Sequence, residues 1–213
     1  MSLVTLLANL PIDLGQGSFA HKTTGKLIGF KQIPVPHSGA KALDLGCGDG
    51  YWSEKLKALG YKTISIDIER EFPNVDADHP YKGMIPLNAN RDLPFPNNSF
   101  DVIWCSEVIE HLDNARHAAK EIQRLVKPMG VYVVTTPNSF FWLHYLLKLF
   151  GLSNPDWQNK GHKSFFSIAD MKELFPQADI YGYFPYILIK AKIKNFVSFL
   201  SPTFVVVGRK PSN

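Results

Sequence analysis

The sequence predicts an α/β fold with a doubly wound, mostly parallel sheet. In the segment 40–70, an apolar run leads through a turn with three glycines and a helical pattern to a second apolar run. Strands that are connected through a helix in this way lie parallel in one sheet. Further apolar runs at 101–105 and 131–136, with an amphipathic helical pattern at 113–126 between them, repeat this order. We therefore expect alternating strands and helices with helices on both faces of the sheet.

The chain of 213 residues fits one domain of this class. We expect residues 40–213 to form a ligand-binding domain, and residues 1–39 to form an N-terminal arm or a lid. Apolar residues make up 45% and charged residues 20%, which is typical of a soluble globular protein. Two cysteines do not suggest a disulfide framework, and the N-terminus lacks the pattern of a signal peptide. These features predict a cytoplasmic protein.

The net charge of +4 is unevenly distributed. The last 34 residues contain five basic residues and no acidic residue, so they carry +5 and the remainder carries −1. A basic face of this kind suits an anionic lipid or phosphate, or it is simply a solvated surface. The basic residues do not form a long patch with spaced aromatic residues, so no nucleic-acid partner is expected.

The glycine turn and the strand after it predict a nucleoside-containing ligand. Gly46, Gly48 and Gly50 allow positive φ angles and a close approach of a ligand, because glycine has no Cβ. Asp67 ends the second apolar run, 17 residues after Gly50. A carboxylate at the end of this strand is placed to accept hydrogen bonds from a ribose diol.

The spacing G-x-G-x-G, with Asp44 two residues before the first glycine, resembles motif I of the class I S-adenosylmethionine-dependent methyltransferases. The resemblance implies a Rossmann-like, mostly parallel seven-stranded sheet with an antiparallel last strand, and S-adenosylmethionine as the cofactor. An NAD-dependent oxidoreductase is disfavoured, since its fingerprint is G-x-G-x-x-G. The resemblance assigns cofactor contacts to the following residues of the first two strands and the turn: Asp44, Gly46, Cys47, Gly48, Gly50, Asp67 and Ile68.

A second stretch, 93–103, reads L-P-F-x-x-x-S-F-D followed by apolar residues and is similar to the same methyltransferases. The similarity departs at Asn88, where an acidic residue usually contacts the adenine amino group. The carbonyl oxygen of an asparagine still accepts a hydrogen bond from that amine. Asn88, Ala89 and Asn90 are therefore adenine-side candidates.

The sequence E-V-I-E-H at 107–111 resembles a motif of the subgroup that includes the ubiquinone-biosynthesis O-methyltransferases. The resemblance places this motif at the edge that faces the transferable methyl group, with Cys105 and Glu107 as further cofactor contacts. His111 would serve as a general base at neutral pH. Alternatively, Glu107, Glu110 and His111 share one helical face and hold a divalent metal, or they brace the helix and shape the pocket. Bracing is the preferred interpretation, and no metal ligand is assigned.

Two later segments bear on the acceptor. The sequence G-H-x-x-x-F-S at 161–167 resembles the same family, which makes His162 a second candidate base or a structural hydrogen-bonding residue. The apolar stretch 139–151 lines a pocket for a hydrophobic acceptor, lies on a membrane surface, or belongs to the core or an oligomer contact. The connector at 186–200 is predicted as a basic amphipathic helix that meets a membrane or covers the sheet edge.

The predicted function is transfer of a methyl group from S-adenosylmethionine to an oxygen or nitrogen of a small or lipid-linked acceptor. The sulfonium already makes the methyl group reactive, so alignment and exclusion of water supply much of the acceleration and a dedicated base is not required. The alternative is a cofactor-binding regulatory or assembly protein without transferase activity, whose pocket is blocked at the edge 107–111. The oligomeric state is open.

Overall fold

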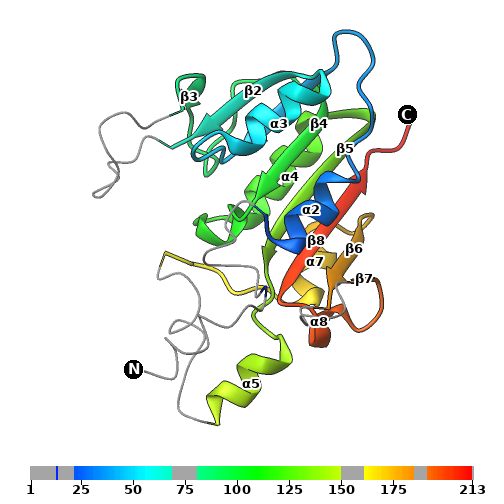
Figure 1. Ribbon diagram of the computed structural model, residues 1–213. Coiled ribbons are helices and arrows are strands. Elements are labelled where there is room, and N and C mark those ends of the chain that lie inside the picture. The colour runs from blue at the N-terminus through cyan, green and yellow to red at the C-terminus, as the bar shows by residue number, and fades with distance from the viewer. Residues whose placement is uncertain (1–12, 14–21, 69–80, 150–160, 185–190, 213) are drawn as a thin grey trace.

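The computed structural model describes residue 13 and the ranges 22–68, 81–149, 161–184 and 191–212. Its centre is an eight-stranded sheet in the order β3-β2-β1-β4-β5-β8-β6-β7 (Figure 1). The strands are β1 (Lys41–Leu45), β2 (Lys62–Asp67), β3 (Met84–Pro86), β4 (Phe100–Ser106), β5 (Val126–Pro137), β6 (Asp179–Tyr183), β7 (Lys192–Ile193) and β8 (Thr203–Arg209). The predicted α/β fold is confirmed.

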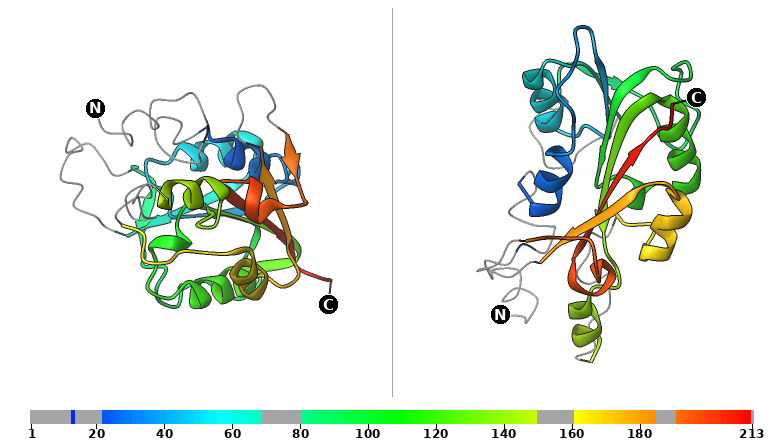
Figure 2. Two further views of the ribbon diagram at one scale, coloured as in Figure 1. Left: turned by 90° about the horizontal axis from the view of Figure 1, so that it is seen from below. Right: turned by 90° about the vertical axis from the view of Figure 1, so that its right-hand side faces the viewer.

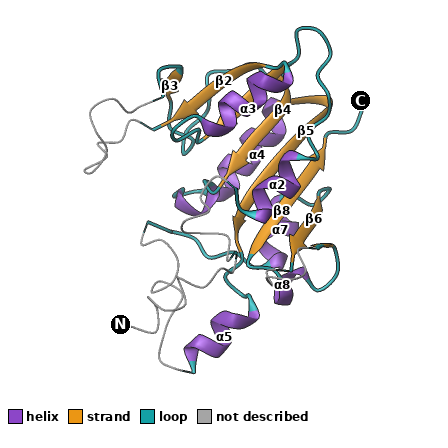
Figure 3. Ribbon diagram, viewed as in Figure 1, coloured by secondary structure: helices purple, strands orange, loops and turns teal. Residues whose placement is uncertain are grey.

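Described helices cover both faces of this sheet, and α5 lies beyond its end (Figures 2 and 3). They are α2 (Thr24–Phe30), α3 (Tyr51–Leu59), α4 (Ala115–Leu125), α5 (Trp142–Lys148), α7 (Ile168–Leu174) and α8 (Val197–Leu200), with a short 3₁₀ helix, η1 (Ile109–His111). Helices α2 and α3 cover one face, where Trp52 and Trp104 form the centre of an aromatic cluster. Helices α4 and α7 cover the other face, where Ile122, Met171 and Phe175 are buried. Two apolar cores therefore fix the sheet between two helical layers.

The strand directions place the carboxyl ends of β1, β2 and β4 at one edge. Strand β1 pairs in parallel with β2 on one side and with β4 on the other, so the strand order reverses next to β1. Ligands of open α/β sheets bind at such a switch point. The last strand, β8, pairs antiparallel with both β5 and β6, as predicted. The additional strand β7 has only two residues, which is too short to leave a pattern in the sequence.

The described part of the N-terminal arm packs on the sheet. A Cβ atom at Gly29 would lie 2.8 Å from Cγ1 of Val133 and 3.2 Å from Cγ1 of Val205, so glycine allows α2 to approach β5 and β8 closely. Thr23 caps α2, because its hydroxyl accepts a hydrogen bond from the backbone N–H of Lys26. The helix suggested by the sequence near residues 3–10 lies outside the described residues. The lid hypothesis for that part stays a prediction.

The connector before β8 differs from the predicted amphipathic helix in its described part. Ile193 belongs to β7, which pairs with β6, and only Val197–Leu200 are helical. Phe196 separates the two elements with a φ of 53°, a left-handed conformation that interrupts a regular helix. The prediction of one continuous helix through 191–200 is therefore wrong. Residues 185–190 lie outside the described ranges.

Candidate functional site

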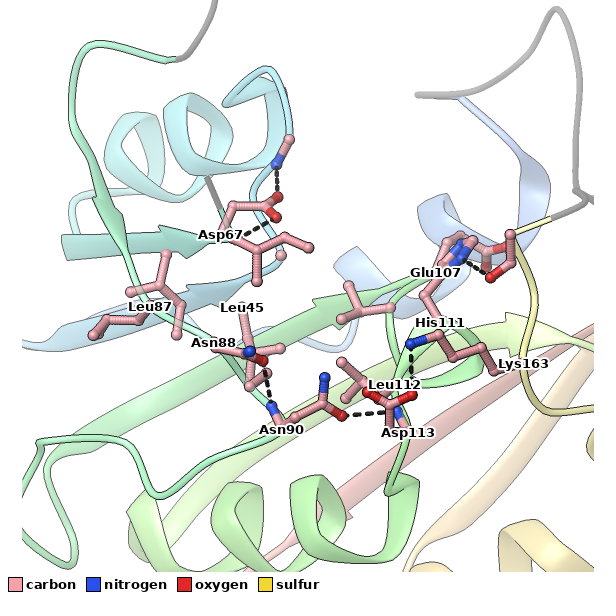
Figure 4. A pocket seen from close by; sticks show the side chains of 17 residues that line it. Leu45, Asp67, Leu87, Asn88, Asn90, Glu107, His111, Leu112, Asp113 and Lys163 are labelled. Atoms are coloured by element: carbon pink, nitrogen blue, oxygen red, sulfur yellow. Dashed lines mark hydrogen bonds and ion pairs between the residues drawn. The ribbon is translucent and has the colours of Figure 1, made fainter. Parts of the chain in front are cut away.

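A cavity of about 630 Å³ opens at the carboxyl ends of β1, β2 and β4 (Figure 4). Its volume lies in the usual range of small-molecule sites. The lining residues come from the ends of these strands, from the segment after β3 and from the loop before α7: Leu45, Gly46, Gly48, Ile66, Asp67, Ile68, Leu87, Asn88, Ala89, Asn90, Glu107, Val108, His111, Leu112, Asp113, Gly161 and Lys163. The cavity thus lies at the switch point that the sheet topology defines.

The glycine turn forms one wall of the cavity. The backbone N–H groups of Gly46 and Cys47 both donate to the carbonyl oxygen of Ile66, at 2.8 and 3.0 Å, which ties the turn to β2. Gly46 has a φ of 76°, and a Cβ atom there would lie 2.2 Å from Cγ2 of Val108. A Cβ atom at Gly48 would meet no atom within 4 Å, so this side of the turn is left open for a ligand. Gly50 caps α3 and does not line the cavity.

Asp67 lies at the tip of β2 and faces the turn (Figure 4). Its Oδ2 atom accepts a hydrogen bond from the backbone N–H of Gly48 at 2.8 Å, and its Oδ1 atom accepts one from Ile68 at 2.7 Å. A carboxylate offers about four acceptor positions, so both oxygens keep capacity for the hydroxyls of a diol. This arrangement suits the predicted ribose contact.

Asp67→Ala should weaken binding of S-adenosylhomocysteine by about 1–3 kcal/mol, roughly 5- to 150-fold, because it removes the acceptors for the ribose hydroxyls. Isothermal titration calorimetry measures this change. Asp92→Ala is the matched control, since the Asp92 side chain is 89% exposed and lies outside the cavity lining. An affinity of Asp67→Ala equal to that of the control would remove Asp67 from the ligand site.

Asp44 and the two cysteines lie outside the cavity lining. Asp44 is buried under the turn, where its Oδ2 atom accepts a hydrogen bond from the Ser53 hydroxyl at 2.6 Å. Burial raises the pKa of Asp44 to about 7. Burial also raises the pKa of the Cys47 thiol to about 12 and that of Cys105 well above its usual value. These thiols are therefore protonated at neutral pH, and a role as nucleophile does not fit them.

The adenine-side candidates are organised by their own hydrogen bonds. The side-chain carbonyl of Asn88 accepts from the backbone N–H of Asn90 at 2.9 Å. The carbonyl of Asn90 in turn accepts from the backbone N–H of Asp113 at 2.7 Å (Figure 4). These bonds fix both amides at the cavity wall, and the second lone pair of the Asn88 oxygen remains suited to an amine.

At the opposite end of the cavity, the motif 107–111 does not form the predicted helical face. Only residues 109–111 are helical, as the 3₁₀ turn η1, and Glu107 precedes it with a φ of 57°. Glu107 therefore does not share a helical face with Glu110 and His111, and that hypothesis is wrong. Glu107 lines the cavity, and its Oε1 atom accepts a hydrogen bond from the Thr135 hydroxyl at 2.9 Å. Burial raises the pKa of Glu107 above its ordinary value.

The two candidate bases lie together. The rings of His111 and His162 are 4.7 Å apart, edge to face, although 50 residues separate them in sequence. The Nδ1 atom of His111 lies 3.0 Å from the carbonyl oxygen of Gly161, so it donates a hydrogen bond there. Burial lowers the pKa of His162 to about 4, with a smaller contribution from the charge of His111. His162 is therefore a weak base at neutral pH, and His111 is the member of the pair that lines the cavity.

The profile of a family described as a methyltransferase domain matches residues 21–181, three quarters of the chain. The chain belongs to the class I S-adenosylmethionine-dependent methyltransferases. It is 28% identical to a ubiquinone biosynthesis O-methyltransferase of Pelagibacter ubique over 58% of its own length and 56% of that protein. It is 31% identical to a probable S-adenosylmethionine-dependent methyltransferase of Mycolicibacterium smegmatis, over 51% of this chain and 42% of that one. The chain thus spans about half the length of the curated relatives it matches.

Solved methyltransferase structures share the fold of this methyltransferase. A S-adenosylmethionine-dependent methyltransferase from Archaeoglobus fulgidus matches with a TM-score of 0.63 at 17% identity, over 90% of this chain and 97% of that one. Another, from Mesorhizobium loti, matches with a TM-score of 0.64 at 15% identity, over 89% and 99% of the two chains. At sequence identities this low, the similarity shows only that the proteins share a fold.

The cavity of the methyltransferase fits S-adenosylmethionine in volume, in the open side of the glycine turn and in the carboxylate at the tip of β2. Of the predicted contacts, the structure brings the following to the cavity wall: Gly46, Gly48, Asp67, Ile68, Asn88, Ala89, Asn90, Glu107 and His111. Sequence reasoning missed eight lining residues, which lie within or close to the motifs that it used: Leu45, Ile66, Leu87, Val108, Leu112, Asp113, Gly161 and Lys163. The contacts of all these residues with the cofactor stay predictions.

Proposed function

We propose that this methyltransferase transfers the methyl group of S-adenosylmethionine to an oxygen of a small or lipid-linked acceptor. The observation that carries the proposal is that one cavity joins the glycine turn and Asp67 to the polar edge formed by Glu107 and His111. The relatives named as O-methyltransferases support oxygen as the accepting atom. Nitrogen is the alternative acceptor, and a cytoplasmic location remains part of the proposal.

When bound, S-adenosylmethionine supplies a methyl group that its sulfonium makes electrophilic. The residues of the chain then bind and orient the cofactor and the acceptor, and they exclude water from the site. Asp67 holds the ribose, and the Asn88–Asn90 segment lies where the adenine is expected. Val108 and Leu112 add apolar surface to the lining of the same cavity. Such fixed alignment supplies a large part of the rate enhancement of a displacement reaction.

A binding protein without transferase activity is less well supported. That hypothesis predicts a pocket that is blocked at the edge 107–111. Glu107, Val108 and His111 instead line the same cavity as Gly48 and Asp67. The space expected for the cofactor therefore continues to the edge at which an acceptor would approach.

Two measurements test the proposal. Calorimetric titration with S-adenosylmethionine and S-adenosylhomocysteine should show micromolar binding of both. Incubation with S-adenosylmethionine labelled in the methyl group should then transfer label to a hydroxylated compound among phenols, quinols and lipid extracts. Absence of binding by both nucleosides would overturn the proposal, and label transferred only to amines would replace oxygen by nitrogen.

The end of the molecule that carries α5 and α8 supports contact with an anionic membrane surface (Figures 1 and 2). Among the described residues, Leu149 after α5 is 81% exposed and Phe196 before α8 is 79% exposed. Lys192 and Lys194, in and next to β7, lie on the aromatic ring of Tyr181, and Lys194 is also 3.5 Å from the Asp179 carboxylate. Apolar residues beside lysines are typical of proteins that lie on a membrane surface. None of the helices described here has the length and apolar character needed to cross a membrane. This contact would bring the enzyme to a lipid-linked acceptor.

The paired substitution Lys192→Glu with Lys194→Glu should lower cosedimentation with phosphatidylglycerol vesicles at least about fivefold, since each basic residue near such a surface contributes about 1 kcal/mol. Vesicles of phosphatidylcholine should bind weakly in both cases. Lys62→Glu, at the start of β2, is a control with the same charge reversal at one site, half the charge change of the paired variant. Equal binding by wild type and the paired variant would contradict the membrane contact.

A further inference from the structure

The segment on the adenine side of the cavity has no regular secondary structure of its own. Residues 87–99 connect β3 to β4, and none of them belongs to a helix or a strand. Asn88, Ala89 and Asn90, here called the adenine-side wall, line the cavity. Ala89 and Leu93 are buried in the core and hold the segment at two points. The backbone groups of such a segment need hydrogen-bond partners from other elements.

Helix α4 supplies the first of these partners through Glu121. The Glu121 side chain is only 7% exposed, and its Oε2 atom accepts a hydrogen bond from the backbone N–H of Leu93 at 2.9 Å. The same carboxylate forms a two-pronged ion pair with Arg124, in which Nε donates to Oε1 at 2.6 Å and Nη2 donates to Oε2 at 2.7 Å. Pairs with this geometry are strong and directional. The hydrogen bonds from Arg124 lower the pKa of Glu121, so the pair is ionised at neutral pH.

Arg124 binds the same segment through its remaining donors. Its Nη2 atom also donates to the carbonyl oxygen of Leu93 at 3.1 Å. Its Nη1 atom donates to the carbonyl oxygen of Phe95 at 2.8 Å and to Oδ1 of Asn97 at 2.9 Å. A guanidinium has five N–H donors, and these three bonds together with the two to Glu121 use all five. The pair therefore satisfies both the N–H and the carbonyl group of Leu93, as a neighbouring strand would.

The two ends of α4 hold the same segment. The last turn of the helix accepts hydrogen bonds from the backbone N–H groups of Asn98 and Ser99, at 3.0 and 2.8 Å. Just before the helix begins, the backbone N–H of Asp113 donates to Oδ1 of Asn90 at 2.7 Å. One helix thus fixes the segment at the adenine-side wall, at Leu93 and at its end.

We propose that Glu121 and Arg124 are positioning residues that hold the adenine-side wall in the shape that binds the cofactor. Neither side chain is among the described residues that line the cavity, so both act through the segment 87–99. A wall that is ordered before the ligand arrives raises affinity, because binding then costs less conformational entropy. This role rests on the placement of the adenine beside Asn88 and Asn90, which the proposed function shares. It does not depend on the acceptor.

Calorimetric titration with S-adenosylhomocysteine tests the role in the full chain. Arg124→Lys keeps the positive charge, but the three donors of an ammonium on one nitrogen cannot replace the five bonds of the guanidinium. We expect this substitution to weaken binding at least fivefold, and Glu121→Gln to weaken it in the same direction. Arg116→Lys is the matched control, because it makes the same change in the same helix at an exposed ion pair with Glu173. The control should stay within twofold of the wild type.

Hydrogen–deuterium exchange distinguishes a local role from general support of the fold. In the wild type, saturating S-adenosylhomocysteine should protect peptides from both the glycine turn at 46–50 and the segment 87–97. In Arg124→Lys at saturating ligand, protection should fall at 87–97 and stay unchanged at 46–50. An equal loss in both regions would overturn the positioning role, since the pair would then support the whole domain. Circular dichroism establishes that each variant is folded, and Glu121→Gln keeps the test valid if Arg124→Lys unfolds.

The outcomes separate this role from the proposed function. An affinity of Arg124→Lys equal to that of Arg116→Lys, in a chain whose wild type binds S-adenosylhomocysteine, overturns the positioning role alone. Weaker binding with a local loss of protection, in a chain that transfers no methyl label to any acceptor, supports the positioning role and overturns the proposed transfer. Absence of S-adenosylhomocysteine binding by the wild type overturns both.

Discussion

Gly46→Ala is expected to lower the affinity for S-adenosylmethionine at least about 100-fold, or roughly 3 kcal/mol. Gly46 has a φ of 76°, which costs a residue with a Cβ atom about 1–3 kcal/mol. The new Cβ atom would also lie 2.2 Å from Cγ2 of Val108, so the turn and the 107–111 segment have to separate. Both segments line the cavity, and calorimetric titration measures the loss.

Gly39→Ala is the matched control for backbone strain. Gly39 has a φ of 79°, and a Cβ atom there would meet no atom within 4 Å. It precedes β1, at the end of the strands away from the cavity. The Gly39→Ala control should lose some thermal stability and keep its affinity for S-adenosylmethionine. Equal affinity of both variants would show that the turn tolerates the displacement and that its contact with Val108 does not shape the ligand site.

Asp44→Asn is expected to stabilise the protein more at pH 8 than at pH 4, by up to about 4 kcal/mol between the two. The pKa of Asp44 is about 7 in the folded chain and about 3.9 in an unfolded one. Between these values the folded state holds a proton that the unfolded state has lost, so wild-type stability falls as the pH rises from about 4 to 7. An asparagine has no such proton, so the stability of the Asp44→Asn variant does not fall with pH in this way.

Urea unfolding at the two pH values measures this difference. Glu173→Gln serves as the control, because Glu173 is an exposed carboxylate whose side chain is 60% accessible in its ion pair with Arg116. It should change the pH dependence by well under 1 kcal/mol. Parallel pH profiles for wild type and Asp44→Asn would mean that Asp44 is ionised in the folded protein, with its charge balanced by the neighbouring hydroxyls.

The local patterns predicted the centre of the fold well. The glycine turn and Asp67 belong to one strand, helix and strand unit, so their spacing along the chain determines their geometry. The antiparallel last strand that the resemblance implied is observed as β8, Thr203–Arg209. The position of Asp44 was harder to predict, since the residue accepts a hydrogen bond from Ser53, which also bonds Ser65, and this depends on how α3 packs on the sheet.

The segment 107–111 shows what the sequence did not determine. The motif 107–111 suggested a helix with three ligands on one face, but the left-handed φ of Glu107 and the short 3₁₀ turn change the direction of its side chain. His162 joins Glu110 through backbone bonds of the following residues across a long stretch of chain. A single residue with a left-handed φ, such as Glu107, leaves no periodic pattern in the sequence. A contact between segments far apart in the chain leaves none either.

The insertion of β8 between β5 and β6 has a consequence for biosynthesis. On the ribosome, β5 and β6 are made before their shared neighbour, and α2 emerges long before the strand on which it packs. The nascent chain therefore exposes an unpaired edge of β5 until the final residues of β8 have left the exit tunnel. Contacts between segments so far apart in sequence also slow folding. This chain is expected to depend on chaperones during synthesis more than a protein whose sheet grows from one edge to the other.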